Sequence, residues 1–293
     1  MRYRIVHTTE YEYGSEVAES YSEARMLPRE LPHQQCIERR LRILPSPADY
    51  REHDDFFGNR VASFSHHRPH RSLMVEATSL IDTHPLSPPD LLASAPWEAV
   101  VARLRTESES ASISARQFVL GSPLVVPGAA LRTYAEPSFR PGRPFAEAAA
   151  DLSSRIHHDF TYEAGSTELD TKADVALAGR TGVCQDFSHV MIGCLRSLGL
   201  AARYVSGYLE TTPPPGEERL IGADASHAWV GVFMPGSGWF DLDPTNDLQP
   251  GERHITTAWG RDYTDVTPLK GVLFSDGGEH ELNVSVDVAP VPA

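Results

Sequence analysis

The first 85 residues alternate between hydrophobic and polar side chains with the two-residue period of β-strands. The alternating segments are 3–5, 8–12, 36–44, 54–63 and 72–83. Gly58 and Asn59 place a turn inside the fourth segment, and prolines at 85, 88 and 89 end the pattern. We therefore expect a β-rich N-terminal domain over residues 1–85.

Beyond this point the apolar residues recur at helical spacing. We expect helices over 95–105 and 145–158, separated by prolines at 137, 141 and 144. Residues 86–144 are accordingly expected to form a helical connector, and a second domain is expected over 145–293.

The most regular helical pattern covers residues 181–200, with apolar side chains at 187, 190, 191, 194, 195 and 198. Thr181 is the expected N-cap and Gly199 the expected stop. Cys184 then falls in the first turn, where free N–H groups and the helix dipole favour a thiolate. A nucleophilic cysteine and a small buried hydrophobic residue both remain open for Cys184, whereas Cys194 lies within the apolar stripe and is expected to pack.

The helix is followed by a series of expected strands. They cover residues 201–210, 227–234 and 239–243, with a loop rich in proline and glutamate at 211–218. His227 opens one strand, and Asp241 and Asp243 lie on the next. A histidine oriented by a carboxylate is the base that activates a cysteine nucleophile.

The chemistry restricts how these last two strands pair. Side chains alternate between the faces of a strand, and directly opposed residues of an antiparallel pair share a face. Direct opposition of His227 and Asp243 pairs Val232 with Gly238 and leaves a five-residue loop, 233–237. A four-residue loop, 235–238, would turn Asp243 away from His227. We therefore expect an odd-numbered loop or a bulge between the two strands.

Composition narrows the class of protein. The chain has 293 residues, 41% of them hydrophobic and 23% charged, and a net charge of −14. This is a globular composition, and its negative charge disfavours nucleic acids and anionic membranes as partners. The N-terminus reads as a strand without a signal-peptide core, and no apolar run approaches the roughly 20 residues of a membrane span. We expect a cytoplasmic protein; its oligomeric state is left open.

The cysteines and histidines predict neither a disulfide framework nor a metal site. Three cysteines are too few for a framework or for a zinc site with four cysteine ligands. Cys184 and Cys194, ten residues apart on one helix, would be separated by about 15 Å, too far for a disulfide. His66, His67 and His70 form a short cluster that Pro69 interrupts, and we interpret them as solvated. No cofactor is expected.

Three segments carry a resemblance to a known family. GVCQDFSH, SHAWVGVF and GWFDLDPTND resemble the core motifs of the bacterial transglutaminase-like superfamily, which belongs to the papain-like cysteine enzymes. The resemblance assigns the nucleophile to Cys184, the base to His227 and the orienting acid to Asp243. Tyr162 is a candidate oxyanion-hole donor, and Trp229 and Trp239 are candidate walls of the site, although all three could serve packing alone.

The N-terminal segments YRIVHTTEYEYGSEV and DDFFGNRV also resemble the β-rich domain that precedes this core in many bacterial members. The resemblance implies an α+β fold, and we expect residues 271–288 to form a β-hairpin turning at 276–278 and returning to a sheet.

The resemblance implies acyl transfer on an amide of a protein or peptide through a thioester. Hydrolysis by a peptidase or amidase is favoured. Transfer to an amine, as in a transglutaminase, is the alternative. A silent fold used for binding or assembly is the alternative of another class.

Overall fold

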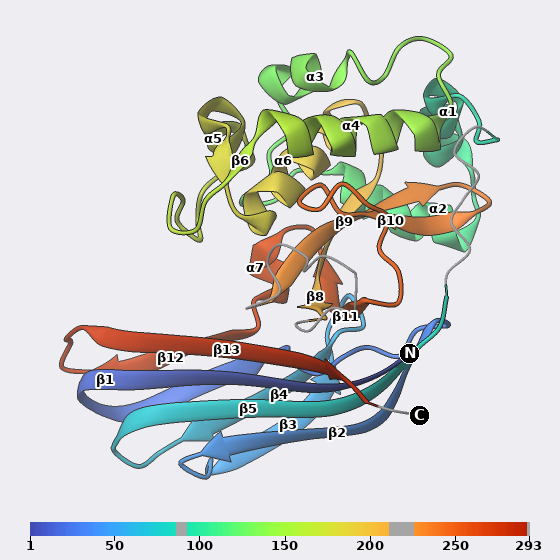
Figure 1. Cartoon of the computed structure of the whole chain (residues 1–293). Helices are drawn as coiled ribbons and strands as arrows, with labels where there is room; N and C mark the ends of the chain where they lie inside the picture. Colours follow the sequence, from blue (N-terminus) through green and yellow to red (C-terminus); the bar gives the residue numbers. More distant parts are fainter. Residues whose placement is uncertain (86–92, 211–225, 292–293) are drawn as a thin grey trace.

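The computed structural model describes residues 1–85, 93–210 and 226–291. Its architecture is α+β, with a β-rich layer at the bottom of Figure 1 and a smaller sheet above it that is covered by helices. The proline- and glutamate-rich loop expected at 211–218 lies outside the described residues. Among the residues described, no helix has both the length and the apolar character needed to cross a membrane.

The lower sheet is built around β1 (Arg2–Ala24), a strand long enough for two partners to follow one another along each of its edges. The remaining strands of the first 85 residues are β2 (Gln34–Leu44), β3 (Asp49–Asp54), β4 (Arg60–His66) and β5 (His70–Thr83). β5 pairs with the first half of β1 and β4 with the second half, while β2 extends β5 and β3 extends β4.

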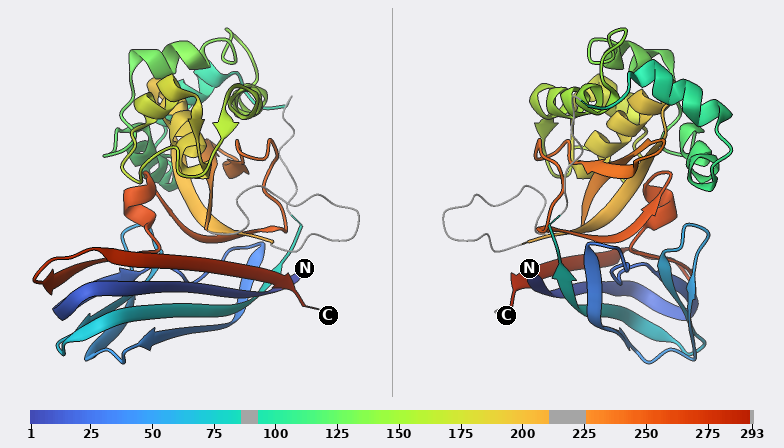
Figure 2. Two further views of the ribbon diagram at one scale, coloured as in Figure 1. Left: turned by 60° about the vertical axis from the view of Figure 1, so that its left-hand side comes forward. Right: turned by 90° about the vertical axis from the view of Figure 1, so that its right-hand side faces the viewer.

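The C-terminal segment returns to this sheet, as expected, but the hairpin expected within it is wrong. β12 (Leu269–Ser275) pairs with the second half of β1, and β13 (His280–Pro290) pairs with the first half, both antiparallel. The turn at 276–279 therefore carries the chain onward along the same edge of β1. These strands belong to the N-terminal sheet, and not to the 145–293 unit in which the sequence pattern places them (Figures 1 and 2).

The upper sheet has the strand order β10 (Gly238–Leu242), β9 (His227–Met234), β8 (Ala202–Leu209) and β11 (His254–Gly260). Helix α6 (Cys184–Ser197) packs against β8 and β9 with its apolar stripe, so that Cys194 is buried as expected. α1 (Trp97–Thr106) and α4 (Phe145–Asp159) match the two expected helices.

The other elements of the upper layer are short. They are α2 (Ser110–Ala115), η1 (Arg116–Val119), α3 (Ala129–Ala135), β6 (Thr161–Tyr162), α5 (Ala173–Gly179), β7 (Thr181–Gly182) and α7 (Tyr263–Val266).

The end of α6 is fixed by a buried arginine. The Arg196 guanidinium donates hydrogen bonds to the carbonyls of Phe118, Ala202 and Arg261 and to the hydroxyl of Ser122. The chain then turns at Gly199, whose φ of 84° favours glycine, as the sequence predicts. One side chain thus ties the helix to η1, β8 and the segment before α7.

The two layers share an apolar contact. Tyr3 and Ile5 of β1 pack with Ile81 of β5 against Tyr208 of β8 and Ile255 of β11. The upper sheet therefore rests directly on the inner face of the lower one, and β11 lies next to the N-terminal strands (Figure 1).

At Gly207, the backbone of β8 lies very close to residues of β11 and β9. A Cβ at this position would lie 2.2 Å from the carbonyl oxygen of Ile255 and 2.4 Å from the Trp229 ring. We expect Gly207→Ala to lower the free energy of unfolding by about 1–3 kcal/mol in urea denaturation. Gly251→Ala, where a Cβ meets nothing within 4 Å, is the matched control and should change it by less than about 0.5 kcal/mol. Equal effects would contradict the packing argument.

Candidate active site

The start of α6 is built by a short strand pair and one carboxylate. β7 pairs in parallel with β6 directly before the helix. Asp186 then accepts hydrogen bonds from the Val183 N–H (2.8 Å) and the Thr167 hydroxyl (2.7 Å). Gly182 leaves room for this carboxylate, because a Cβ there would lie 2.5 Å from its Oδ2 atom. The helix begins at Cys184, so Thr181 is not the N-cap; it lies in β7.

Cys184 is therefore the first residue of the helix, with 8% of its surface exposed. The first N–H groups of a helix have no carbonyl one turn earlier to bind, and they favour a nearby negative charge. Cys184 acts electrostatically on the imidazole of His227, which is buried at the start of β9 and whose Nδ1 has no hydrogen-bond partner.

His227 has a second partner on its other side. Its Nε2–H donates to Oδ2 of Asp243 over 2.9 Å, and both side chains are fully buried. Burial alone would oppose protonation of the ring. The charges of Asp243 and Cys184 and the hydrogen bond to Asp243 outweigh burial and raise the pKa of His227 to about 10.

The strand register brings these two residues onto one face. Phe240 pairs with Val232 and Gly238 with Met234, which leaves a three-residue loop, 235–237. The loop is odd-numbered, as the chemistry requires, so the expected sharing of a face is confirmed. The expected five-residue loop is wrong: the strands are shifted by one residue pair, and His227 reaches Asp243 diagonally.

The Asp243 carboxylate accepts five hydrogen bonds. Oδ1 accepts from the backbone N–H groups of Thr245 and Asn246, at 2.9 and 3.2 Å. Oδ2 accepts from the side chain of Asn246 at 2.8 Å and from His254 Nε2 at 3.2 Å, in addition to His227. Burial raises the pKa of a carboxyl group, but His227 and His254 hold the pKa of Asp243 well below its usual range.

The sequence pattern did not predict His254, because no motif marks it. It lies on β11, seven residues beyond the last motif, which ends at Asp247, and only the sheet order brings it to Asp243. His227, Asp243 and His254 place one ligand atom each within 4.8 Å of one another, which is a spacing that a divalent metal could use. Five donors satisfy the carboxylate, whereas Nδ1 of His227 and Nδ1 of His254 are buried without a hydrogen-bond partner.

The two candidate wall tryptophans lie in different places. Trp229 stacks beside His227, with ring centroids 6.2 Å apart, and donates a 2.9 Å hydrogen bond to Asp241. Trp239 instead packs against Phe118 and Phe233, at the other end of the strand pair. The structure therefore brings Trp229, and not Trp239, to the candidate triad.

Tyr162 lies in β6, where its backbone pairs with Gly182, two residues before Cys184. Its ring contacts Phe187 on α6, with centroids 6.3 Å apart. It is thus close to the start of the helix, and its role as an oxyanion donor stays a prediction.

The expectation that the histidine cluster is solvated is wrong for His66 and His70, which are folded into the lower sheet, and holds for His67. His66 and His70 are buried against Ser20, while His67 is exposed beside Asp49. All three cysteines are free thiols. Burial raises the pKa of Cys194, and also that of Cys36, so neither is prepared as a nucleophile.

A cysteine at the start of a helix, with a histidine on β9 bound to an aspartate directly after β10, is the arrangement of residues found in papain-like folds. Residues 3–82 match the bacterial transglutaminase-like N-terminal region, and residues 132–244 match the transglutaminase-like superfamily. The chain belongs to the transglutaminase-like superfamily.

Similar proteins span almost the whole chain. Uncharacterized proteins of Mycobacterium tuberculosis (strain ATCC 25618 / H37Rv) and Mycobacterium leprae (strain TN) are 44% and 34% identical to it, over 99% and 98% of this chain and 93% and 98% of theirs. A Cytophaga hutchinsonii crystal structure, provisionally assigned as a cysteine protease, matches with a TM-score of 0.77. It covers all of this chain and 91% of its own at 20% identity, which shows a shared fold.

The His227–Asp243 pair makes stability depend on pH. The pKa of His227 is raised in the folded state, so its contribution is fully present below about pH 6.5 and is lost as the pH rises towards 10. The pKa of Asp243 is lowered, so its contribution is lost only as the pH falls below about 4. The pair stabilises the fold most between these limits.

In a Cys184→Ala background, which removes the titration of the thiol, we expect the destabilisation caused by Asp243→Asn to be larger at pH 6 than at pH 9.5. As the pH rises, the loss of unfolding free energy caused by Asp243→Asn should decrease by at most about 1.4 kcal/mol per pH unit, measured by urea denaturation. Asp276→Asn, at an exposed position of the turn after β12, is the control and should show no such trend. A destabilisation by Asp243→Asn that is constant over this range would show that His227 is not charged in the folded protein.

Proposed function

We propose that the protein is a cysteine-dependent acyl-transfer enzyme that acts on amide bonds of a protein or peptide through a thioester. The observation that carries this proposal is the buried His227, which binds Asp243 through Nε2 and keeps Nδ1 without a hydrogen-bond partner on the side where the charge of Cys184 acts on the ring. An imidazole held between a thiol at a helix start and a carboxylate is suited to take the proton of the thiol.

In the first half of the reaction the Cys184 thiolate attacks the carbonyl carbon of the amide. The negative charge on the carbonyl oxygen is stabilised by N–H groups at the start of α6, with Tyr162 as the proposed second donor. The C–N bond then breaks, and the His227 imidazolium gives its proton to the leaving amine. The acyl group remains on Cys184 as a thioester.

In the second half His227, now neutral, takes a proton from the incoming nucleophile. The nucleophile attacks the thioester, the C–S bond breaks, and the thiolate is restored. Asp243 keeps the ring in the tautomer and orientation that both halves need, because it holds the proton on Nε2.

We propose water as this nucleophile, which makes the protein a hydrolase. The second candidate is a transglutaminase, in which an amine takes the place of water. A specific likeness favours the second: a 105-residue segment, 34% of this chain and 16% of the relative, is 33% identical to a protein-glutamine gamma-glutamyltransferase of Pseudomonas aeruginosa.

Selective alkylation tests the nucleophile. With iodoacetamide at pH 6 we expect Cys184 to be modified, and Cys36 and Cys194 to be spared as internal controls, because an ordinary thiol is almost wholly protonated there. Peptide mass spectrometry measures the modification at each site. An unmodified Cys184 in the folded protein would contradict the activated thiol and favour a binding module.

Substitutions in the candidate triad test the role of each of its three residues. Cys184→Ala should abolish amide cleavage and amine incorporation with the fold intact by circular dichroism, and His227→Ala should do nearly the same. Asp243→Asn should keep a residual rate, reduced by about 10⁴-fold, because it disturbs the tautomer of the base and leaves the nucleophile in place. An active Cys184→Ala protein would overturn the covalent mechanism.

Product analysis distinguishes the two nucleophiles. Casein incubated with the wild-type protein and an excess of a labelled primary amine serves as the probe, with Cys184→Ala as the blank. Hydrolysis predicts new peptide termini or deamidated side chains without the label, whereas transglutamination predicts labelled glutamine residues. If the labelled amine is incorporated faster than the substrate is hydrolysed, the protein is a transglutaminase and not a hydrolase.

A further inference from the structure

The candidate triad depends on a strand that the N-terminal sheet holds in place. β11 is the outermost strand of the upper sheet, and it pairs with β8 along one edge only. Its other edge faces the lower layer, where no regular strand partners it in the described part of the chain. An unpaired edge leaves backbone N–H and C=O groups that must find other partners when they are buried.

Two buried amide side chains supply those partners, and the Arg29 N–H also donates to the Thr256 carbonyl at 3.1 Å. Gln34 of β2 accepts from the Thr256 N–H and donates to the Thr256 carbonyl, at 2.8 Å in both cases. Asn59, just before β4, accepts from the Trp259 N–H and donates to the Trp259 carbonyl, at 2.9 Å in both cases. Gln34 and Asn59 are both fully buried. Each amide therefore pairs with β11 as a neighbouring strand would.

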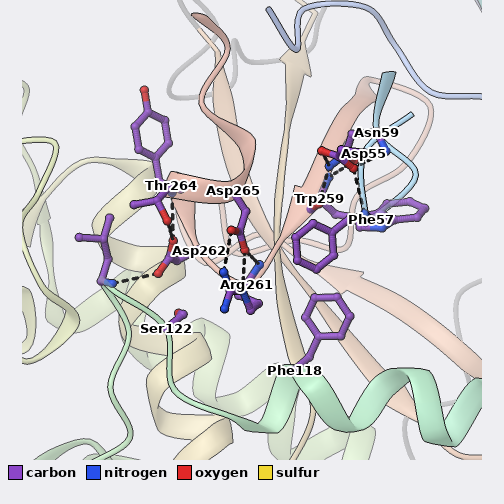
Figure 3. A network of polar contacts seen from close by, with 12 residues as sticks. Asp55, Phe57, Asn59, Phe118, Ser122, Trp259, Arg261, Asp262, Thr264 and Asp265 are labelled. Atoms are coloured by element: carbon purple, nitrogen blue, oxygen red, sulfur yellow. Dashed lines mark hydrogen bonds and ion pairs between the residues drawn. The ribbon is translucent and has the colours of Figure 1, made fainter. Parts of the chain in front are cut away.

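Figure 3 shows how Asn59 is held in turn. Asp55 accepts hydrogen bonds from the backbone and side chain of Asn59 and from the Phe57 N–H, so the loop presents the amide to Trp259 in one orientation. Arg29 stacks over the Trp259 ring at 3.5 Å and also donates a hydrogen bond to Asn59. The contact between the layers is thus built from specific polar groups of the N-terminal region.

His254 lies two residues before Thr256 on the same strand, and its imidazole reaches the triad. Its Nε2–H donates to the Asp243 oxygen that also binds His227. The edge of its ring packs against Trp229, with centroids 5.3 Å apart. Burial lowers the pKa of His254, so this ring is neutral and its proton lies on the nitrogen that faces the carboxylate.

We propose that His254 is a positioning residue for Asp243, and that the N-terminal sheet fixes it there through Gln34 and Asn59. The inference rests on the proposed function, since it concerns the same cysteine, histidine and aspartate. A neutral N–H donor stabilises the carboxylate without competing for its proton, which keeps Asp243 ionised opposite His227. The lower layer thereby becomes part of the machinery that activates Cys184.

The groups that face Asp243 are His227 on β9, His254 on β11, and Thr245 and Asn246 after β10. Cys184 acts on the far side of His227, and the charge of Asp241 acts on His254. Loss of the His254 donor should weaken the hold of Asp243 on the imidazolium and, through it, the thiolate. The effect should appear at pH 6 and vanish near pH 10, where an ordinary thiol is already ionised.

The test measures the rate of Cys184 alkylation by iodoacetamide in the full-length protein at pH 6 and at pH 10. The ratio of the two rates reports activation and cancels changes in access to the thiol. His254→Phe, which keeps the ring shape without a donor, should lower this ratio about tenfold. His254→Gln, whose amide can still donate, should stay within about threefold of the wild type.

The N-terminal contribution is tested by Gln34→Leu, with Gln35→Leu at the adjacent exposed position as the matched control. Gln34→Leu should lower the ratio by about threefold or more, and Gln35→Leu should leave it unchanged. If Gln34 acts through His254, the double variant with His254→Phe should be no worse than His254→Phe alone.

The outcomes separate this inference from the proposed function. A wild-type protein that is not alkylated at Cys184 at pH 6 would refute the proposed function itself. A wild-type protein that is alkylated there, together with an unchanged ratio in His254→Phe, would overturn the positioning role alone. A Gln34→Leu effect that adds fully to that of His254→Phe would refute the path through β11.

Discussion

The ionised Asp243 carboxylate is the group around which the upper domain is arranged. It has no exposed surface, and a buried charge is tolerated only when hydrogen bonds and an opposite charge compensate it. The five donors that do so come from β9, from β11 and from the turn after β10. Any change that moves one of these elements leaves part of the charge unsatisfied, so the carboxylate links strand register, turn geometry and chemistry.

The same requirement explains why the two layers act as one unit. β11 must be in place for His254 to reach Asp243, and β11 is completed by Gln34 and Asn59 of the lower sheet. The C-terminal strands return to that sheet, and the Val291 N–H donates to the Arg2 carbonyl, so the chain ends lie side by side (Figures 1 and 2). The upper domain is thus held between two segments that are distant in the sequence but belong to one sheet.

Local patterns predicted the elements that carry their own period and motif. β9 over His227–Met234 and α4 from Phe145 follow directly from alternating and helical spacing. The parity argument predicted that His227 and Asp243 share a face, because the side-chain alternation of a strand is fixed by its geometry. It could not give the loop length, since loops of three and five residues have the same parity.

The contacts that could not be predicted from the sequence are those between segments that lie far apart in the chain. His254 and Gln34 lie far apart in the chain, and nothing near either one marks it as a partner of Asp243 or of β11. The turn at 276–278 has the composition of a hairpin, but the length of β1 lets both flanking strands follow one edge. Tertiary pairing, which no local pattern encodes, decides such cases.

The most direct test of this account is the protonation state of His227 and His254, measured by NMR on protein labelled with ¹⁵N in the histidine rings. At pH 7.5 the account predicts a doubly protonated ring for His227, with one N–H directed at Asp243, and a neutral ring protonated at Nε2 for His254. His227→Ala and His254→Phe variants assign the signals. A neutral His227 at this pH would contradict the claim that the buried carboxylate holds an imidazolium beside Cys184.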